Sequence, residues 1–418
     1  MTTLLAIGDM HLGRPPTAIP EDLRPRRDEL GPEAAFARAI DEAIRREVDA
    51  VLFAGDLVDQ DRDFFVAYGQ LRSGVEKLTA AGIRVLAVAG NHDTEVLPKL
   101  AAEIEKLELL GADGQWQAQR VDEITVLGWS FPRPQVRQSP LENLPEDIPQ
   151  GTVIGLLHCD LDQVDSTHAP VARRALEDAP VDAWLLGHIH RPDNLDDDRP
   201  IGYLGSISAL RASETGQRGP WLIHVEGRDI AADQLALAPL RYEAIEVDCS
   251  DLDDAAGLGE RVLSAARERL GTLAGGDSAP TAVGLRIRLT GQSKAAAGIA
   301  AAAAELAADD RSWDEQGMAC FVQKIESAVL PKLDLKRLSR QSDPCGLLAR
   351  RLLALESPES EECQRLLRLA RESMSPLVRA REFRELGLQP DDAAIAEWLR
   401  RAGTLALIRL VGQREEAA

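Results

Sequence analysis

The stretch Ala50–Asp59, AVLFAGDLVD, joins a short apolar run to a glycine and two acids. The apolar run predicts a buried strand, and Gly55 allows the backbone to turn sharply where that strand ends. A carboxylate that follows such a strand stands at the carboxyl edge of a sheet, where open α/β folds carry their chemistry. We therefore expect Asp56 to belong to a functional site.

Four other apolar runs end in the same way, each followed by side chains of the kind that bind metal ions. Five of the seven histidines in the chain stand at these ends. The runs and their endings are Leu4–Gly8 with Asp9 and His11, Arg84–Gly90 with Asn91 and His92, Val153–Leu157 with His158, and Ala183–Gly187 with His188 and His190.

Composition is that of an ordinary globular chain. Its 418 residues are 28% charged and 44% apolar, and at this length we expect two or three domains. No apolar run reaches transmembrane length, and Asp9 stands where a signal peptide would be apolar, so we expect a cytoplasmic protein that is nucleoid-associated when it acts. The five cysteines are scattered and odd in number, which favours free thiols over a disulfide framework.

The net charge of −21 argues against a generally basic surface for nucleic acid. It leaves room for local binding, because bound cations and a cluster of arginines reverse the field at one site. The acidity is also uneven, since residues 311–418 carry 18 Lys and Arg against 17 Asp and Glu.

The order of the expected elements predicts a mostly parallel sheet covered by helices. Residues 1–92 have the pattern of two consecutive β-α-β units, with helices at about 33–47 and 64–81. We expect a helix near 97–109, and short strands between 202 and 247 that form a second sheet and close a sandwich. The expected domains are residues 1–245, a small α+β domain at 246–332, and a helical region at 333–418.

The side chains at the strand ends are the ligands that a two-metal phosphoesterase needs, with one carboxylate shared by both ions. We expect Asp56 to be that carboxylate and His92 and Asp59 to be catalytic groups. Mixed imidazole and carboxylate ligation suits Mn²⁺ better than Mg²⁺, with Fe²⁺ or Zn²⁺ as alternatives. The ligand sets are Asp9, His11, His190 and Asp56 for one ion, and Asn91, His158, His188 and Asp56 for the other. His168 and His224 match no motif and are interpreted as structural, and Asp93 is left out of both sets.

These motifs, in this order, resemble the signature of the calcineurin-like metallophosphoesterases, and the version here resembles the bacterial SbcD and YhaO-type DNA repair exonucleases. The similarity extends over about residues 1–245 through Ala169-Pro170, Gly205-Ser206 and Arg211, and it is looser beyond. The resemblance implies a metallophosphoesterase β-sandwich flanked by helices, with a capping domain and a helical C-terminal region. Gln60-Asp61 and Asp93 stand where the protein phosphatases of this superfamily carry Arg-Gly and Glu, which argues against that branch.

The resemblance also implies a function. It implies two-metal hydrolysis of DNA phosphodiester bonds, as exonuclease or endonuclease, in end processing and double-strand-break repair. The implied partners are DNA, an SMC-like ABC ATPase of the SbcC or YhaN type, and a second copy of the chain. His92, held by Asp59, would position the phosphate or protonate the leaving 3′ oxygen, and Arg211 would contact the DNA backbone.

Three alternatives stay open at this point. Two of them replace the DNA nuclease: a small-molecule phosphodiesterase or pyrophosphatase, and a scaffold whose metal site is vestigial. In the C-terminal region, apolar residues recur at helical spacing from Cys363 to Met374 and from Ile395 to Ala406. Those helices either pack on one another or on the small α+β domain, or they dock the coiled coil of the ATPase.

Overall fold

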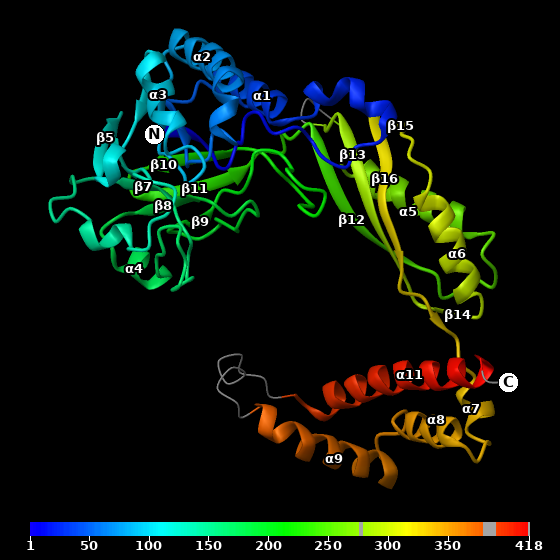
Figure 1. The fold of residues 1–418 in the computed structure, drawn as a ribbon. Coiled ribbons are helices and arrows are strands. Elements are labelled where there is room, and N and C mark those ends of the chain that lie inside the picture. Colours follow the sequence, from blue (N-terminus) through cyan, green and yellow to red (C-terminus); the bar gives the residue numbers. More distant parts are fainter. Residues whose placement is uncertain (276–278, 379–389, 417–418) are drawn as a thin grey trace. The chain divides into compact units, whose positions relative to one another are not determined.

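The computed structural model describes residues 1–275, 279–378 and 390–416 (Figure 1). The chain divides into two compact units. Unit 1 comprises Met1–Glu246, Glu260–Arg288 and Glu305–Ile325, and unit 2 comprises Val247–Gly259, Leu289–Ala304 and Glu326–Ala418. Because this division cuts through the strands after residue 240, the three domains expected from the sequence stay a prediction.

The first sheet of unit 1 has six strands in the order β11-β10-β1-β2-β3-β4. Strands β1 to β4 are parallel, as the β-α-β pattern predicts, and β10 and β11 are added antiparallel beside β1. Their bounds are β1 Thr2–Ile7, β2 Ala50–Phe53, β3 Arg84–Ala87, β4 Leu107–Leu109, β10 Trp221–Glu226 and β11 Asp229–Gln234.

The second sheet has five strands in the order β5-β6-β7-β8-β9. Strands β6 to β9 are parallel, and β5 pairs with β6 antiparallel. Their bounds are β5 Gln117–Val121, β6 Ile124–Trp129, β7 Val153–His158, β8 Ala183–Gly187 and β9 Ile201–Tyr203.

The side chains of β1 alternate between two buried layers. Leu4 and Ala6 are buried with residues of the second sheet such as Ile154, whereas Leu5 and Ile7 are buried with residues of the helices. A period of two puts neighbouring residues on opposite faces of a sheet, so one strand serves two layers. The expected α/β sandwich flanked by helices is confirmed. The helical segments of this part are η1 Glu21–Glu29, α1 Pro32–Arg45, η2 Asp61–Asp63, α2 Phe64–Ala80, α3 Val96–Glu103, η3 Ala112–Gly114, η4 Pro140–Asn143 and α4 Arg173–Asp178.

Two expectations about this sandwich are wrong. The strands between 202 and 247 do not form the second sheet, because β9 lies at its edge, β10 and β11 join the first sheet, and the strand after them enters a third sheet. The helix expected near 97–109 ends at Glu103, and Leu107–Leu109 is strand β4, which pairs with β3. Pairing with a distant strand overrides a local preference in both cases.

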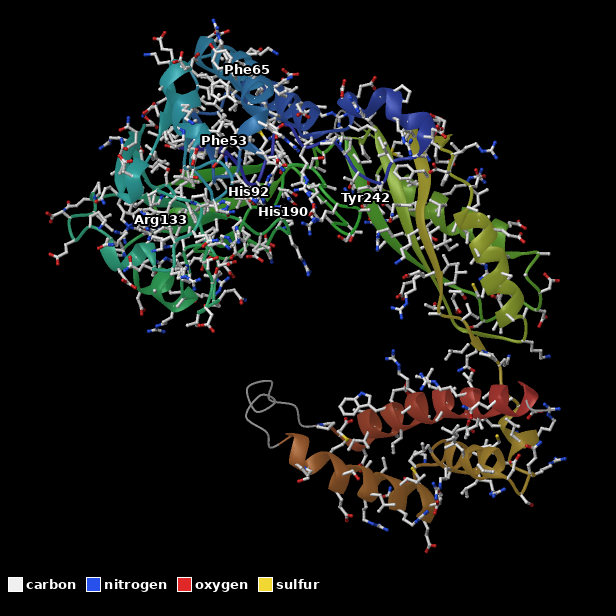
Figure 2. All side chains as sticks on the ribbon, in the orientation of Figure 1. Phe53, Phe65, His92, Arg133, His190 and Tyr242 are labelled. Carbon is white, nitrogen blue, oxygen red and sulfur yellow. The ribbon has the colours of Figure 1, made fainter. Side chains whose placement is uncertain are left out.

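A third sheet has the order β12-β13-β16-β15. Within unit 1, the ring of Tyr242 on β12, labelled in Figure 2, is buried. It packs edge-on against Phe321 on β16, and both are buried with Leu23 and Leu30. The elements of this part of the chain are β12 Leu240–Asp248, α5 Leu258–Gly271, β13 Ala282–Thr290, β14 Gln292–Ser293, α6 Ala296–Ala307, β15 Trp313–Glu315, β16 Met318–Ser327 and β17 Leu330–Pro331.

The described residues from 333 onward are helical, as the sequence predicts. Cys363, Leu367 and Ile395 are buried in one cluster with Leu352. Asp343 caps α8 by accepting a hydrogen bond from the backbone N–H of Gly346. The helices are α7 Leu335–Leu338, α8 Pro344–Ala354, α9 Glu361–Val378 and α11 Asp392–Glu416.

All five cysteines lie in the described part of the chain, and each is a buried free thiol, as expected from their number and spacing. Among the described residues, none of the helices combines the length and the apolar character that crossing a membrane requires.

Gly155 on β7 gives a test of the packing that carries the site. A Cβ at Gly155 would meet Cε3 of Trp184 at 2.1 Å, and that fully buried ring is fixed because its Nε1–H donates to the carbonyl of Leu176. Gly155→Ala should therefore lower the free energy of unfolding by about 1–3 kcal/mol, measured by denaturant titration.

Gly69 in α2 is the matched control, because it is exposed and a Cβ there would meet no atom within 4 Å. Gly69→Ala should raise the free energy of unfolding by about 0.5–1 kcal/mol, since alanine is the better helix former. Equal effects of the two substitutions would contradict the tight packing at Gly155.

Candidate metal centre

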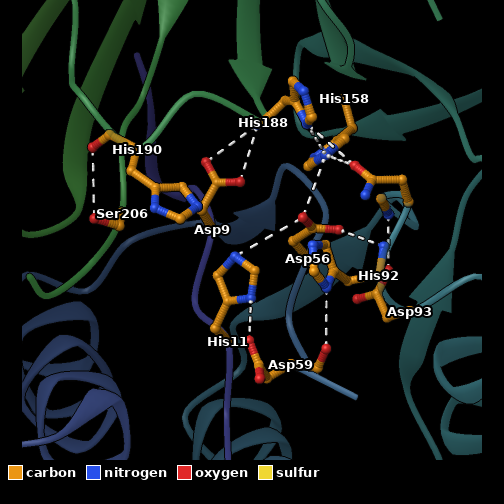
Figure 3. Close-up of polar contacts among 12 residues, drawn as sticks. Asp9, His11, Asp56, Asp59, His92, Asp93, His158, His188, His190 and Ser206 are labelled. Atoms are coloured by element: carbon orange, nitrogen blue, oxygen red, sulfur yellow. Dashed lines mark hydrogen bonds and ion pairs between the residues drawn. The ribbon is translucent and has the colours of Figure 1, made fainter. Parts of the chain in front are cut away.

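The motifs that follow the strands meet at one edge of the sandwich. Asp9 and Asp56 follow β1 and β2 of the first sheet, and His158 and His188 stand at the ends of β7 and β8 of the second. Figure 3 shows these side chains turned toward one another, with Asp56 in the middle. The carboxyl ends of parallel strands share an edge, which is why side chains far apart in sequence converge here.

The backbone of this edge is strained. Asp9, His11, Asp56 and His188 have φ values of 24°, 48°, 49° and 105°, a region that costs a residue with a side chain of order 1–3 kcal/mol. Gly90 permits a close approach, since a Cβ at this position would lie 2.1 Å from Oδ1 of Asp56. Four candidate ligands thus occupy a conformation that glycine adopts at lower cost.

One group of ligands consists of His158, His188 and Asn91. The Nε2 of His158 and the Nδ1 of His188 each lie 3.1 Å from Oδ1 of Asn91, and 3.2 Å from one another. The Nδ1–H of His158 donates to the carbonyl of Ala54 at 3.0 Å, so its Nε2 carries a lone pair. The Nε2 of His188 lies 3.2 Å from Oδ1 of Asp160, and its Nδ1 is within hydrogen-bond distance of both Asn91 and His158.

The lone pairs of Asn91 Oδ1 and His158 Nε2 thus both face Nδ1 of His188. Burial lowers the pKa of His158 to about 4, and burial also lowers the pKa of His188, so both rings are neutral at pH 7. When Nδ1 of His188 also presents its lone pair, two neutral imidazole nitrogens and an amide oxygen converge, and these are ligand atoms of the kind that transition-metal ions bind. The donor set fits a metal ion.

A second group consists of Asp9, His11 and His190, whose potential ligand atoms all lie within 4.8 Å of one another. Each imidazole is oriented from behind by a carboxylate: Nδ1–H of His11 donates to Asp59 at 3.0 Å, and Nδ1–H of His190 donates to Glu214 at 2.9 Å. This leaves Nε2 of each ring as the ligand atom, in the manner of carboxylate–histidine–metal triads. The Nε2 of His11 is buried and has no hydrogen-bond partner, as a ligand atom would be.

Asp56 links the two groups. Its Oδ2 lies 3.8 Å from Nε2 of His11 and 3.5 Å from Nε2 of His158, while its Oδ1 accepts the backbone N–H of His92 at 3.0 Å. The carboxylate is 2% exposed. Burial alone would raise the pKa of Asp56, but the neighbouring imidazoles His158 and His11 hold it below its usual value.

Two further buried carboxylates stand beside it. Burial and the charge of Asp56 raise the pKa of Asp9 well above its usual value. The same two causes raise the pKa of Asp93 to about 8. Asp93 accepts the backbone N–H groups of Leu57 and Gly90 at 2.7 and 2.8 Å, so it ties the two ligand loops together.

His92 and Asp59 are in contact, but through the backbone carbonyl of Asp59 and not through its carboxylate. The Nδ1–H of His92 donates to the backbone carbonyl of Asp59 at 3.1 Å, whereas the Asp59 carboxylate faces His11 and lies 3.5 Å from Arg14. The His92 ring is exposed and stands edge-on to His11, with 5.1 Å between ring centroids. His92 is therefore beside both ligand groups and open to a substrate.

The remaining expected residues lie apart from this convergence. Arg211 is exposed, and its carbonyl accepts the N–H of Glu214 at 3.0 Å. His224 lies on β10 with Nδ1 3.3 Å from the hydroxyl of Thr3, which agrees with a structural role. The sequence analysis missed Glu214 and Asp160, each of which faces a histidine more than 20 residues away. The only local signal for Glu214 was its place in a run, Glu214-Thr215-Gly216, close to Arg211.

Comparisons with known proteins agree with this geometry. Residues 2–192 match the family described as Calcineurin-like phosphoesterase, and residues 242–329 match the Metallophosphoesterase YhaO, middle domain. The uncharacterized metallophosphoesterase YhaO of Bacillus subtilis (strain 168) is 26% identical over 62% of this chain and 66% of its own length.

Two archaeal relatives are named DNA double-strand break repair protein Mre11. The protein of Aeropyrum pernix is 29% identical over 60% of this chain and 64% of its own length. The protein of Haloferax volcanii is 29% identical over 59% of this chain and 55% of its own length. The matches thus span less than two thirds of the length of these relatives. The chain thus carries a calcineurin-like phosphoesterase domain at residues 2–192, followed by a YhaO middle domain at residues 242–329.

Proposed function

We propose that this chain is a metal-dependent DNA nuclease that hydrolyses phosphodiester bonds in DNA end processing and double-strand-break repair. The observation that carries the proposal is the convergence of imidazole, carboxylate and amide ligand atoms around Asp56, from strands of both sheets. The Mre11 relatives support DNA as the substrate, because their names place them in DNA double-strand break repair.

The proposed ligand sets follow the two groups. Asp56 would contribute to both, since its Oδ2 is near an imidazole of each. The ions are most simply Mn²⁺, with Fe²⁺ or Zn²⁺ as alternatives, because imidazole and carboxylate ligands suit these metals. Two such ions supply charge stabilisation to the phosphoryl oxygens and lower the pKa of the attacking water. One site would be held by Asp9, His11, His190 and Asp56, and the other by Asn91, His158, His188 and Asp56.

The protein's own groups orient and complete this centre. Asp59 and Glu214 hold His11 and His190 in the tautomers that present Nε2. His92 is fixed through its backbone N–H on Asp56 and through Nδ1–H on the Asp59 carbonyl. Its other ring nitrogen, Nε2, would bind the phosphate or give a proton to the leaving 3′ oxygen when the ring is doubly protonated.

DNA contacts at an acidic protein have to be local. We propose that Arg211 contacts the DNA backbone, because its side chain is exposed and Glu214, near it in the chain, holds the ligand His190. The arginines between residues 14 and 27 are partly engaged in ion pairs: Arg14 with Asp59, and Arg26 with Glu29.

The proposal includes two protein partners. An SMC-like ABC ATPase of the SbcC or YhaN type would dock on the C-terminal helices, where Trp398 and Leu405 on α11 are 45% and 42% exposed. They are seven positions apart, so they lie on one face of that helix. A second copy of the chain would use an apolar patch at the start of α2, where Phe65 is 84% exposed (Figure 2).

The ligand assignment predicts different metal losses for different variants. Asp56→Ala should lose both ions, because it removes the shared carboxylate, whereas His158→Ala should keep about one. Elemental analysis of each variant after gel filtration gives the number of ions per chain. Asp165→Ala, which removes an exposed carboxylate from the loop after β7, should keep both. Two ions retained by the Asp56 variant would contradict the shared ligand.

The nuclease activity is tested by digestion of end-labelled duplex DNA in the presence of Mn²⁺. The parent chain should shorten the duplex, and His92→Ala should do so about 10²- to 10⁴-fold more slowly with unchanged metal content and DNA binding, since a general acid contributes that much.

His224→Ala is the control histidine, on β10, and should cleave like the parent chain. A panel of nucleotides and dinucleotides is assayed beside the duplex. Activity on the panel with none on DNA would favour a small-molecule phosphodiesterase, and bound metal without any activity would favour a scaffold.

Docking of the ATPase predicts a binding defect that leaves the centre intact. The double variant Trp398→Glu and Leu405→Glu should bind the ATPase at least tenfold more weakly in a co-purification or calorimetric assay, because buried aromatic anchors dominate such interfaces. Leu263→Glu on α5, which also puts a charge at an exposed leucine, should bind normally. Unchanged binding of the double variant would place the docking surface elsewhere.

A further inference from the structure

A carboxylate, a hydroxyl and an imidazole from the loop after β7 stand behind His188, outside the ligand sets named above. Oδ1 of Asp160 lies 3.2 Å from Nε2 of His188. Oδ2 of the same carboxylate accepts the hydroxyl of Ser166 and lies 3.8 Å from Nδ1 of His168. The ring of His168 lies against that of His188, with 5.0 Å between centroids and 38° between planes.

The loop is arranged to hold this carboxylate in place. The backbone N–H of Asp160 donates to the carbonyl of His168, and that of His168 donates to the hydroxyl of Ser166, both at 2.9 Å. The N–H of Ala169 donates to the carbonyl of Val136 at 2.8 Å, which ties the end of the loop to the chain after β6. The side chain of Asp160 is 14% exposed, so it is fixed in a largely water-excluded position.

This arrangement determines which nitrogen of His188 faces the centre. A carboxylate accepts hydrogen bonds and donates none, so Asp160, 3.2 Å from Nε2, favours the tautomer of the neutral ring that carries its proton on Nε2. Nδ1, 3.2 Å from Nε2 of His158, is then left with its lone pair. If the opposite tautomer formed, Nδ1–H would point into the ligand group and Nε2 would repel Asp160.

We propose that Asp160, held by Ser166, is a positioning residue that fixes the tautomer and direction of His188 for the ion shared with His158 and Asn91, and that His168 covers the outer face of this pair. The inference rests on the proposed ligand sets. His188 would then have a carboxylate behind it, as His11 has Asp59 and His190 has Glu214.

The same three residues could instead form a separate cation site, since Asp160, His168 and His188 offer ligand atoms within 4.8 Å of one another. The positions of the protons argue against a separate cation site. A ring that binds one cation through Nδ1 keeps its proton on Nε2, and Oδ2 of Asp160 already accepts from Ser166. The cluster therefore serves the neighbouring ion.

The test is a Mn²⁺ titration of the metal-free full chain, followed by calorimetry and by the electron paramagnetic resonance of free Mn²⁺. The parent chain should bind two ions. Asp160→Ala should weaken one of them about 10- to 100-fold and leave the other unchanged, the usual effect of removing a group that orients a ligand. Asp160→Asn should have a smaller effect, because the amide oxygen still accepts from Nε2–H of His188.

The controls separate positioning from ligation and from folding. Asp165→Asn removes an exposed charge of the same loop and should bind as the parent does. His168→Phe keeps a ring against His188 and should retain both ions. Thermal unfolding of the metal-free variants shows whether each is folded, and Asp160→Asn carries the test if Asp160→Ala is not.

The outcomes that overturn the inference are distinct. Parent-like affinity in both Asp160 variants would remove Asp160 from the centre. Three ions in the parent chain, one of them lost in both Asp160→Ala and His168→Phe, would make the cluster a cation site. A parent chain that binds no Mn²⁺ would reject the proposed function and this inference with it, whereas two ions with unaffected Asp160 variants would reject the inference alone.

Discussion

The carboxylate of Asp56, buried between imidazoles from two sheets, is the constraint on which this part of the molecule depends. Isolated carboxylates are costly to bury, and Asp9 and Asp93 stand close enough to raise the cost further. The neighbouring groups offset this cost. Backbone N–H groups donate to the carboxylates, neutral imidazoles surround them, and the proposed cations would bind between them. To bring these groups together, both sheets must end at the same edge, and glycines must let the loops approach.

Packing beneath the edge follows from the same requirement. The strands that deliver ligands are parallel and buried on both faces, so they consist almost entirely of apolar residues, as in Val51–Phe53 and Ile154–Leu157. That is why the strands and their endings could be predicted from the sequence: an apolar run followed at once by a ligand side chain is a local pattern. The site ligands could be expected for the same reason.

What the sequence left unpredicted depends on contacts between distant residues. Strand β10 pairs with β1 across more than 200 residues, and no local pattern distinguishes it from a strand of the second sheet. Leu107–Leu109 is too short to show a period and takes its conformation from β3. Glu214 and Asp160 are single carboxylates in loops, and only the fold brings them to His190 and His188. The sequence predicted that Asp59 would hold His92, but its carboxylate lies at His11 instead, a distinction that needs coordinates.

The positive φ angles at Asp9, His11, Asp56 and His188 have a consequence for the history of the chain. Each costs folding energy in every molecule made, and glycine at any of them would relieve the strain. A chain selected only for a firm scaffold would gain stability by accepting such replacements and would lose this set of side chains in time. The four strained positions that carry carboxylate and imidazole groups therefore lower the stability of the fold. Selection tolerates such a loss where activity outweighs stability.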